Sequence, residues 1–340
     1  MLDLPPFLKE NDLTYLVAPS FGCATEPYLS RMEAAIKQLK KHGFRVKEGP
    51  NVRRADGVCA SASAKERAAE FMAAYREKES KLILSVGGGE LMDEILPYID
   101  FAELKALPKK WFMGFSDNTH LTFLLTILSD VPSIYGPNLP SFFEKPWRLA
   151  QLDAMRLLQG AREFAGYPKW FGKSNKDWPP LYKPRANLRK LIKAKGFAEP
   201  ISGMLLGGCL DCLRNLVGTR YDRVAAFAAR QKEGIIWYLE ACDLSPLDIR
   251  RALFQFKEAG WFVNAKGIIF GRHLCSVYNP EVMGVDRYNA ADILADLRLP
   301  MLFDIDLGHL GPGLPFLNGG VAQIAYREGN IFLTYENETH

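Results

Sequence analysis

One serine of this 340-residue chain stands where a catalytic nucleophile would be presented. Residues 111–115 are mostly apolar, the run ends at Ser116, and a helical pattern begins at Asp117 and continues to about Leu128. This order predicts a buried strand, a tight turn and a helix, with the Ser116 hydroxyl at the carboxyl end of a sheet. Such a turn favours a nucleophile for acyl transfer. Ser116 could instead be the N-cap of the helix, which is a common role of serine.

Three consecutive glycines follow the strand that the sequence predicts at residues 81–86. Because parallel strands end at the same edge of a sheet, we expect these glycines beside the serine turn. The N–H of Gly88 or Gly89, together with the N–H of Asp117, would then form an oxyanion hole. Neither G-x-G-x-x-G nor the lysine-bearing phosphate loop is present, which disfavours a nucleotide phosphate site. The glycines could also serve only to form a tight turn.

The favoured candidate for a general base is His309, which lies in a Gly/Pro-rich loop directly after a strand predicted at residues 301–305. Catalytic side chains are common in loops of this kind. His273 follows another predicted strand and stays an alternative. Glu240 ends the apolar strand predicted at residues 234–239, where a buried carboxylate is costly unless it is paired or lies at an opening.

The elements that would position these side chains are strands alternating with helices. In residues 1–145 this alternation predicts an α/β fold with a doubly wound (flavodoxin-like) parallel sheet. Ser63 and Glu66 there form a predicted capping box that opens a helix. From 146 to 200 the periodicity is weak and Pro, Lys and Trp are frequent, which indicates a linker and a surface lobe. Residues 201–340 predict a second, mixed α/β domain that closes with a hairpin.

Composition excludes several classes of protein. The chain has 43 Lys and Arg against 39 Asp and Glu, a net charge of +4 with the signs interspersed, so no nucleic-acid partner is expected. No run approaches the roughly 18 apolar residues of a membrane span, and the N-terminus lacks a secretory pattern, which together predict a cytoplasmic protein. Cys209 and Cys212 form a single C-x-x-C without a second ligand pair, so we interpret them as core residues and expect no metal and no cofactor.

Several motifs then occur together in one order. They are Gly114-Phe115-Ser116-Asp117-Asn118-Thr119, Tyr135-Gly136-Pro137, Gly207-Gly208-Cys209-Leu210, Leu239-Glu240, and Gly308-His309 with Pro312 and Pro315. This set resembles the serine LD-carboxypeptidase family. The resemblance implies a catalytic triad with Ser116 as the nucleophile, His309 as the general base and Glu240 as the carboxylate that orients the imidazole. It also implies an oxyanion hole from the turn at Gly88 and Gly89 and from Asp117, and a homodimer.

The chain departs from the common family pattern at positions that border the substrate. Gly89 and Glu90 stand where many members have an aromatic residue after the paired glycines, so Glu90 is a candidate substrate contact. The aromatic linker is more similar to the microcin-immunity branch of the family, in which a linker tryptophan can stack on the nucleobase of a peptidyl-nucleotide antibiotic. Trp170 and Trp178 are the candidates for such a contact.

Three functions follow as hypotheses. The leading one is a serine peptidase that hydrolyses an amide at the C-terminal end of a small peptide and releases D-Ala from murein tetrapeptide during cell-wall recycling. The alternative is a microcin-immunity-type hydrolase that detoxifies peptidyl- or aminoacyl-nucleotides. The third, from a different class, is a non-catalytic binding protein whose two α/β domains close on a small ligand.

Overall fold

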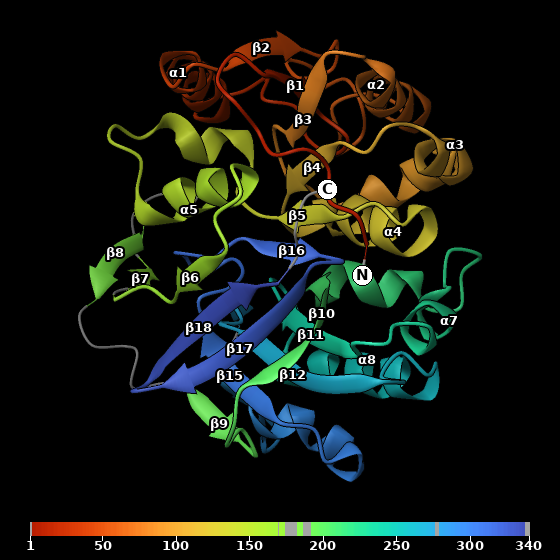
Figure 1. Cartoon of the computed structure of the whole chain (residues 1–340), viewed down its shortest axis with the longest axis vertical. Coiled ribbons are helices and arrows are strands. Elements are labelled where there is room, and N and C mark those ends of the chain that lie inside the picture. The colour runs from red at the N-terminus through yellow and green to blue at the C-terminus, as the bar shows by residue number, and fades with distance from the viewer. Residues whose placement is uncertain (1, 169, 174–181, 186–191, 276–278, 337–340) are drawn as a thin grey trace. The chain divides into compact units, whose positions relative to one another are not determined.

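The structure is a computed structural model that describes residues 2–168, 170–173, 182–185, 192–275 and 279–336 (Figure 1). The chain divides into two units, which are described one at a time. The N-terminal unit consists of Leu2–Ala161 and Pro315–Gly320. The C-terminal unit consists of Arg162–Leu314 and Val321–Glu336.

A largely parallel sheet forms the centre of the N-terminal unit. Its strand order is β2-β1-β3-β4-β5-β16, in which β1 to β5 run parallel and β16 is antiparallel to β5. The strands are β1 Leu13–Val17, β2 Arg45–Glu48, β3 Ser80–Ser85, β4 Trp111–Gly114, β5 Ser133–Tyr135 and β16 Phe316–Asn318. The order 2-1-3-4-5 is that of flavodoxin-like doubly wound folds, so the predicted fold of this half is confirmed.

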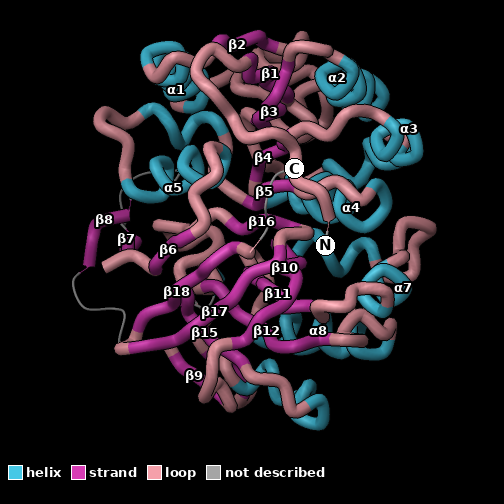
Figure 2. The backbone as a smooth tube through the Cα atoms, viewed as in Figure 1, coloured by secondary structure: helices cyan, strands magenta, loops and turns pink. Residues whose placement is uncertain are grey.

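Helices cover both faces of this sheet, with α1 and α5 on one side and α2, α3 and α4 on the other (Figures 1 and 2). Their bounds are α1 Tyr28–Lys41, α2 Ala64–Arg76, α3 Phe101–Ala106, α4 Thr119–Ser129 and α5 Leu149–Leu158, with 3-10 helices η1 Met92–Tyr98, η2 Ser116–Asn118 and η3 Leu139–Phe143. Because neither face meets water, β1 and β4 are buried along their whole length.

Local sequence signals explain how α2 is placed against the sheet. The predicted capping box is confirmed: the Glu66 N–H donates to Ser63 Oγ, and the Ser63 N–H donates to the Glu66 carboxylate at 3.1 Å. The buried face of the helix then packs Phe71 into a core that includes Ile83 and Phe112 from the sheet. Burial of such side chains contributes about 1.5–3 kcal/mol each.

A mixed sheet forms the centre of the C-terminal unit, as the sequence predicted. Its order is β6-β18-β17-β10-β11-β12-β15-β9, in which β10, β11, β12 and β15 run parallel and the other neighbours are antiparallel. The strands are β6 Glu163–Ala165, β9 Lys193–Lys195, β10 Ile201–Cys209, β11 Ile235–Glu240, β12 Ala265–Gly271, β15 Met301–Ile305, β17 Val321–Arg327 and β18 Asn330–Tyr335. Two separate hairpins pair β7 Trp170–Lys173 with β8 Tyr182–Arg185 and β13 Glu281–Val282 with β14 Val285–Asp286.

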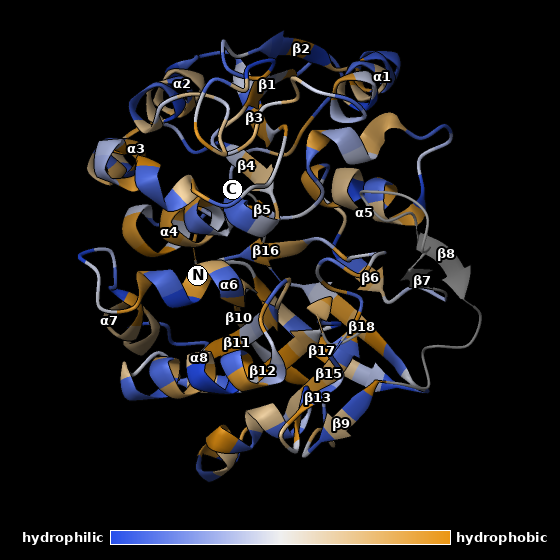
Figure 3. Ribbon diagram, turned by 180° about the vertical axis from the view of Figure 1, so that it is seen from behind, coloured by the Kyte–Doolittle hydropathy of each residue, from blue (hydrophilic) through white to orange (hydrophobic). Residues whose placement is uncertain are grey.

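The helices of this unit are α6 Leu210–Leu213, α7 Val224–Ala229 and α8 Pro246–Glu258, with 3-10 helices η5 Arg214–Leu216 and η7 Asn289–Leu297. In Figure 3 the strands of the sheet are largely hydrophobic, whereas α8 carries both hydrophobic and hydrophilic residues. Its N-cap is Ser245, which accepts the Asp248 N–H, and Pro246 occupies the first turn. No helix among the described residues is both long and apolar enough to cross a membrane.

Candidate active site

Ser116 occupies a strained turn directly after β4. Its φ of +65° is left-handed, which is uncommon for a residue with a side chain. The Ser116 N–H donates to the Tyr135 hydroxyl at 3.1 Å, and the Phe115 N–H donates to Asn138 Oδ1 at 3.1 Å. The N-cap residues are Phe115 for η2 and Asn118 for α4, so Ser116 is not the cap of either helix. A serine held in a strained turn between strand and helix is typical of nucleophiles.

The glycine loop lies against this turn, as the strand order predicts. A Cβ at Gly88 would lie 3.1 Å from Ser116 Cβ and 3.3 Å from Ser116 Oγ. At Gly89, whose φ is +155°, a Cβ would lie 2.1 Å from Ser20 Oγ. A side chain at Gly89 would therefore clash, one at Gly88 would be tight, and the loop backbone approaches the serine closely. The next residue, Glu90, is exposed.

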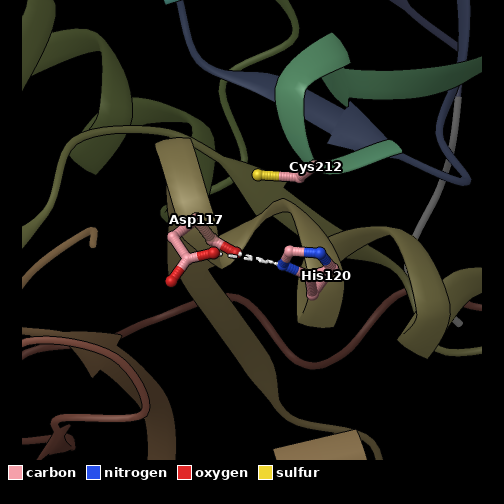
Figure 4. A group of neighbouring side chains, drawn as sticks. All are labelled: Asp117, His120 and Cys212. Carbon is pink, nitrogen blue, oxygen red and sulfur yellow. Dashed lines mark hydrogen bonds and ion pairs between the residues drawn. The ribbon is translucent and has the colours of Figure 1, made fainter. Parts of the chain in front are cut away.

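The Asp117 side chain connects the loops around Ser116. Its carboxylate is 2% exposed and accepts a hydrogen bond from the Ser20 hydroxyl, in the loop after β1, and one of 2.9 Å from the Met92 N–H, after the glycine loop. The ring of His120 lies beside the same residue, with Nδ1 at 3.0 Å from the Asp117 carbonyl oxygen and at 3.2 Å from its carboxylate (Figure 4). Asp117 thus fixes three segments relative to one another with its side chain.

In the C-terminal unit, Glu240 and His309 form a buried pair. Glu240 is the last residue of β11 and is fully buried, and His309 is 13% exposed. The distance from His309 Nδ1 to Glu240 Oε2 is 2.8 Å. Gly308, with a φ of +93°, precedes the histidine, and a Cβ there would lie 2.4 Å from Glu240 Oε2. His309 therefore provides the partner that the buried Glu240 carboxylate requires. The two side chains can lie this close because residue 308 is a glycine.

The charge of Glu240 determines the protonation of this histidine. Burial alone would lower the pKa of His309, but the Glu240 carboxylate and the hydrogen bonds with Cys242 and Glu240 raise it well above its usual value. The surroundings therefore stabilise the imidazolium.

Arg272, which the sequence analysis missed, fixes the loop that carries His309. Its guanidinium is buried and donates to Asp306 Oδ1 at 2.6 Å, to the Leu310 carbonyl at 2.9 Å and to the Pro312 carbonyl at 3.0 Å. Arg272 and Asp306 each directly follow a predicted strand. Their positions in the sequence could therefore have predicted this ion pair.

The alternative base, His273, lies in a different environment. It is 2% exposed, and neither ring nitrogen has a hydrogen-bond partner within the described ranges. Burial lowers the pKa of His273 to about 4. The His273 ring is neutral and has no hydrogen bond to a carboxylate among the described residues, whereas the His309 ring has one to Glu240.

The predicted site residues thus fall into two groups. Ser116 lies with Gly88, Gly89 and Asp117 in the N-terminal unit, and Glu240 lies with His309 in the C-terminal unit. Trp170 begins β7, which pairs with β8. Trp178 lies outside the described residues.

The N-terminal unit thus holds a serine in a strained turn, and the C-terminal unit holds a buried carboxylate paired with a histidine. The chain belongs to the LD-carboxypeptidase family. Residues 15–136 match the LD-carboxypeptidase N-terminal domain, and residues 202–324 match the LD-carboxypeptidase C-terminal domain. The family resemblance seen in the sequence is therefore confirmed, and the chain is a member of a family of carboxypeptidases.

Two curated relatives have different names but similar coverage. A Bacillus subtilis protein with the name "Probable murein peptide carboxypeptidase" is 25% identical over 315 residues, covering 91% of this chain and 88% of the relative. The microcin C7 self-immunity protein MccF of Escherichia coli is 24% identical over 320 residues, covering 92% and 90%.

Solved structures share the fold. MccF in complex with glutamyl sulfamoyl guanosine aligns with a TM-score of 0.81 at 23% identity, covering 100% of this chain and 99% of that chain. The muramoyltetrapeptide carboxypeptidase from Oxalobacter formigenes aligns with a TM-score of 0.69 at 23% identity, covering 96% and 100%. These likenesses confirm the α/β fold class.

Proposed function

We propose that this protein is a serine carboxypeptidase in which Ser116, His309 and Glu240 act as one triad. The observation that carries the proposal is the buried carboxylate of Glu240, 2.8 Å from His309 Nδ1. A carboxylate in that position fixes the tautomer of the imidazole and stabilises its charged form. The strained turn at Ser116 supports its role as the nucleophile. The proposal includes a contact between the Ser116 hydroxyl and the His309 ring.

In the proposed reaction, His309 Nε2 takes the hydroxyl proton as Ser116 Oγ attacks the carbonyl carbon of the scissile amide. The N–H groups of Asp117 and of Gly88 or Gly89 donate to the oxyanion that forms. His309 then gives its proton to the leaving amine as the C–N bond breaks. Water, activated in the same way, hydrolyses the acyl-enzyme and restores the serine.

We propose that the substrate is murein tetrapeptide and that the amine released is D-Ala. The name of the Bacillus subtilis relative supports this substrate class. A second candidate is the hydrolysis of peptidyl- or aminoacyl-nucleotides, because MccF is a relative of similar coverage whose solved structure holds glutamyl sulfamoyl guanosine. In that case Trp170 and Trp178 are the proposed contacts of the nucleobase, whereas Glu90 is a proposed substrate contact for either function. We also propose a cytoplasmic location, from the sequence pattern, and a homodimer, from the family resemblance, which cell fractionation and light scattering would test.

Mass spectrometry of the products tests the proposal. Wild type and Ser116→Ala are incubated with L-Ala-D-Glu-meso-diaminopimelate-D-Ala and, separately, with a peptidyl-adenylate analogue. Release of D-Ala by the wild type alone supports the leading function, and cleavage of the nucleotide conjugate alone supports the second. If both substrates stay intact, both substrate proposals fail and a non-catalytic binding protein becomes the better account. If Ser116→Ala is fully active, the triad is wrong.

A further inference from the structure

A third side chain with metal-binding chemistry lies beside the Glu240 and His309 pair. Cys209 is the last residue of β10, and the parallel register of β10 with β11 sets it next to Glu240. One donor atom from each of Cys209, Glu240 and His309 lies within 4.8 Å of the other two. Cys209 is 1% exposed and Glu240 fully buried. A sulfur, an oxygen and a nitrogen donor thus lie close together in the C-terminal unit.

We propose that Cys209, Glu240 and His309 form an inhibitory binding site for a divalent cation of the zinc class. Thiolate, imidazole and carboxylate are the protein ligands that zinc takes. The cation is proposed as an inhibitor and not as a cofactor, since it uses the two groups that the reaction needs.

A tetrahedral ion requires the donor atoms, which lie within 4.8 Å of one another, to adjust their separations. With metal–ligand distances of about 2.0–2.3 Å, neighbouring donors of a tetrahedral site lie about 3.4–3.6 Å apart. His309 Nδ1 and Glu240 Oε2 are now 2.8 Å apart, so they need to separate by about 0.6 Å. The thiol and imidazole protons that leave on binding go to solvent.

Neighbouring groups support the same site. Asp211 Oδ2 accepts from Cys209 Sγ at 3.3 Å and from the Cys242 N–H at 3.0 Å, so it positions the neutral thiol before its proton leaves. The Cys242 side chain is hydrogen-bonded to His309. His309 and Cys242 are both partly exposed, which gives an ion a path to the buried donors.

Inhibition follows because the ion would occupy His309 Nδ1 and the Glu240 carboxylate at once. The imidazole could then no longer be oriented or charged by Glu240. This consequence rests on the proposed function, whereas the binding of the ion does not.

Cobalt(II) binding and zinc inhibition test the two parts separately. The Cys59→Ser variant is used throughout, because Cys59 is an exposed thiol that could bind metal by itself. Titration of this protein with CoCl2 should produce a thiolate-to-cobalt charge-transfer band, and ZnCl2 should displace the cobalt. Cys209→Ser and Cys209→Ala, each added to this background, should lose the band. Removal of an outer partner costs about 10–100-fold in affinity at metal sites, so we expect loss of this ligand to raise the zinc Kd by more than about 100-fold.

The outcomes separate this proposal from the proposed function. A band that persists in both Cys209 variants, or no cobalt binding by folded protein, overturns the site. If the band depends on Cys209 but no peptide is hydrolysed, the site stands and the proposed function fails. If hydrolysis occurs and zinc leaves its rate unchanged while the band forms, the inhibitory role is wrong.

Discussion

Replacing Gly308 with alanine should damage the Glu240 and His309 pair by adding a single Cβ atom. That atom would lie 2.4 Å from Glu240 Oε2 and 2.7 Å from its Cδ. Non-bonded atoms do not approach so closely, so the carboxylate must move away from the ring that it now contacts at 2.8 Å. His309 would then lose the carboxylate that orients its ring, which the proposed function needs.

The size of the effect follows from the contact that is lost. A hydrogen bond to a charged group contributes about 1.5–3 kcal/mol. If that amount is missing in the transition state, kcat/KM falls by about 10- to 160-fold. The left-handed backbone at Gly308, with a φ of +93°, adds a cost in stability of about 1–2 kcal/mol for any residue with a side chain.

Gly284→Ala is the matched control. Its φ is +80°, and no described atom lies within 4 Å of an added Cβ. Urea unfolding should show a similar backbone cost for both variants, whereas only Gly308→Ala should lose kcat/KM in a steady-state assay. Equal kcat/KM for the two variants would refute the role of the Glu240 contact.

Three further predictions concern buried charged groups. Asp117→Ala should lower the free energy of unfolding by about 1–3 kcal/mol in urea, because the buried Met92 N–H loses its acceptor, whereas Asp117→Asn keeps one and should lose less. Arg272→Gln should lower the free energy of unfolding by about 3–5 kcal/mol, because the Asp306 charge loses its ion-pair partner. Adding Asp306→Asn should recover part of this free energy in urea unfolding. A double variant without recovery would contradict the pairing. Burial raises the pKa of Glu70 from 4.5 to about 6, so the folded state binds its proton more tightly than the unfolded state. This proton stabilises the folded state by about 2 kcal/mol below about pH 4.5, and the stabilisation is lost as pH rises through about 6. In Glu70→Gln, the free energy of unfolding in urea should no longer show this dependence on pH across the same range.

The serine turn could be read from the sequence because its signals are local. An apolar run, a break and a helical pattern specify a strand, a turn and a helix within a few residues of one another. The helix itself begins two residues later than predicted, at Thr119, because Ser116–Asn118 form a 3-10 turn first. Because parallel strands end at the same edge of a sheet, the sequence could also predict that Gly88 lies beside Ser116.

The long-range contacts of the site could not be read in this way. Glu240 ends β11 and His309 lies in the loop after β15, 69 residues further on, and only the family resemblance joined them. The bonds of Asp117 to Ser20 and Met92 depend on the order of strands in the sheet. The strand β16 is three residues long, and only its pairing with β5 defines it.

The most direct test of the central claim is a cycle of kcat/KM values for wild type, Ser116→Ala, His309→Ala and the double variant, on the substrate that the wild type hydrolyses. Residues that act as one unit are strongly non-additive. If Ser116 and His309 form one triad, each single variant should lose at least about 10³-fold, and the double variant should be no slower than the worse single one. Losses that multiply in the double variant, or full activity of Ser116→Ala, would contradict the account.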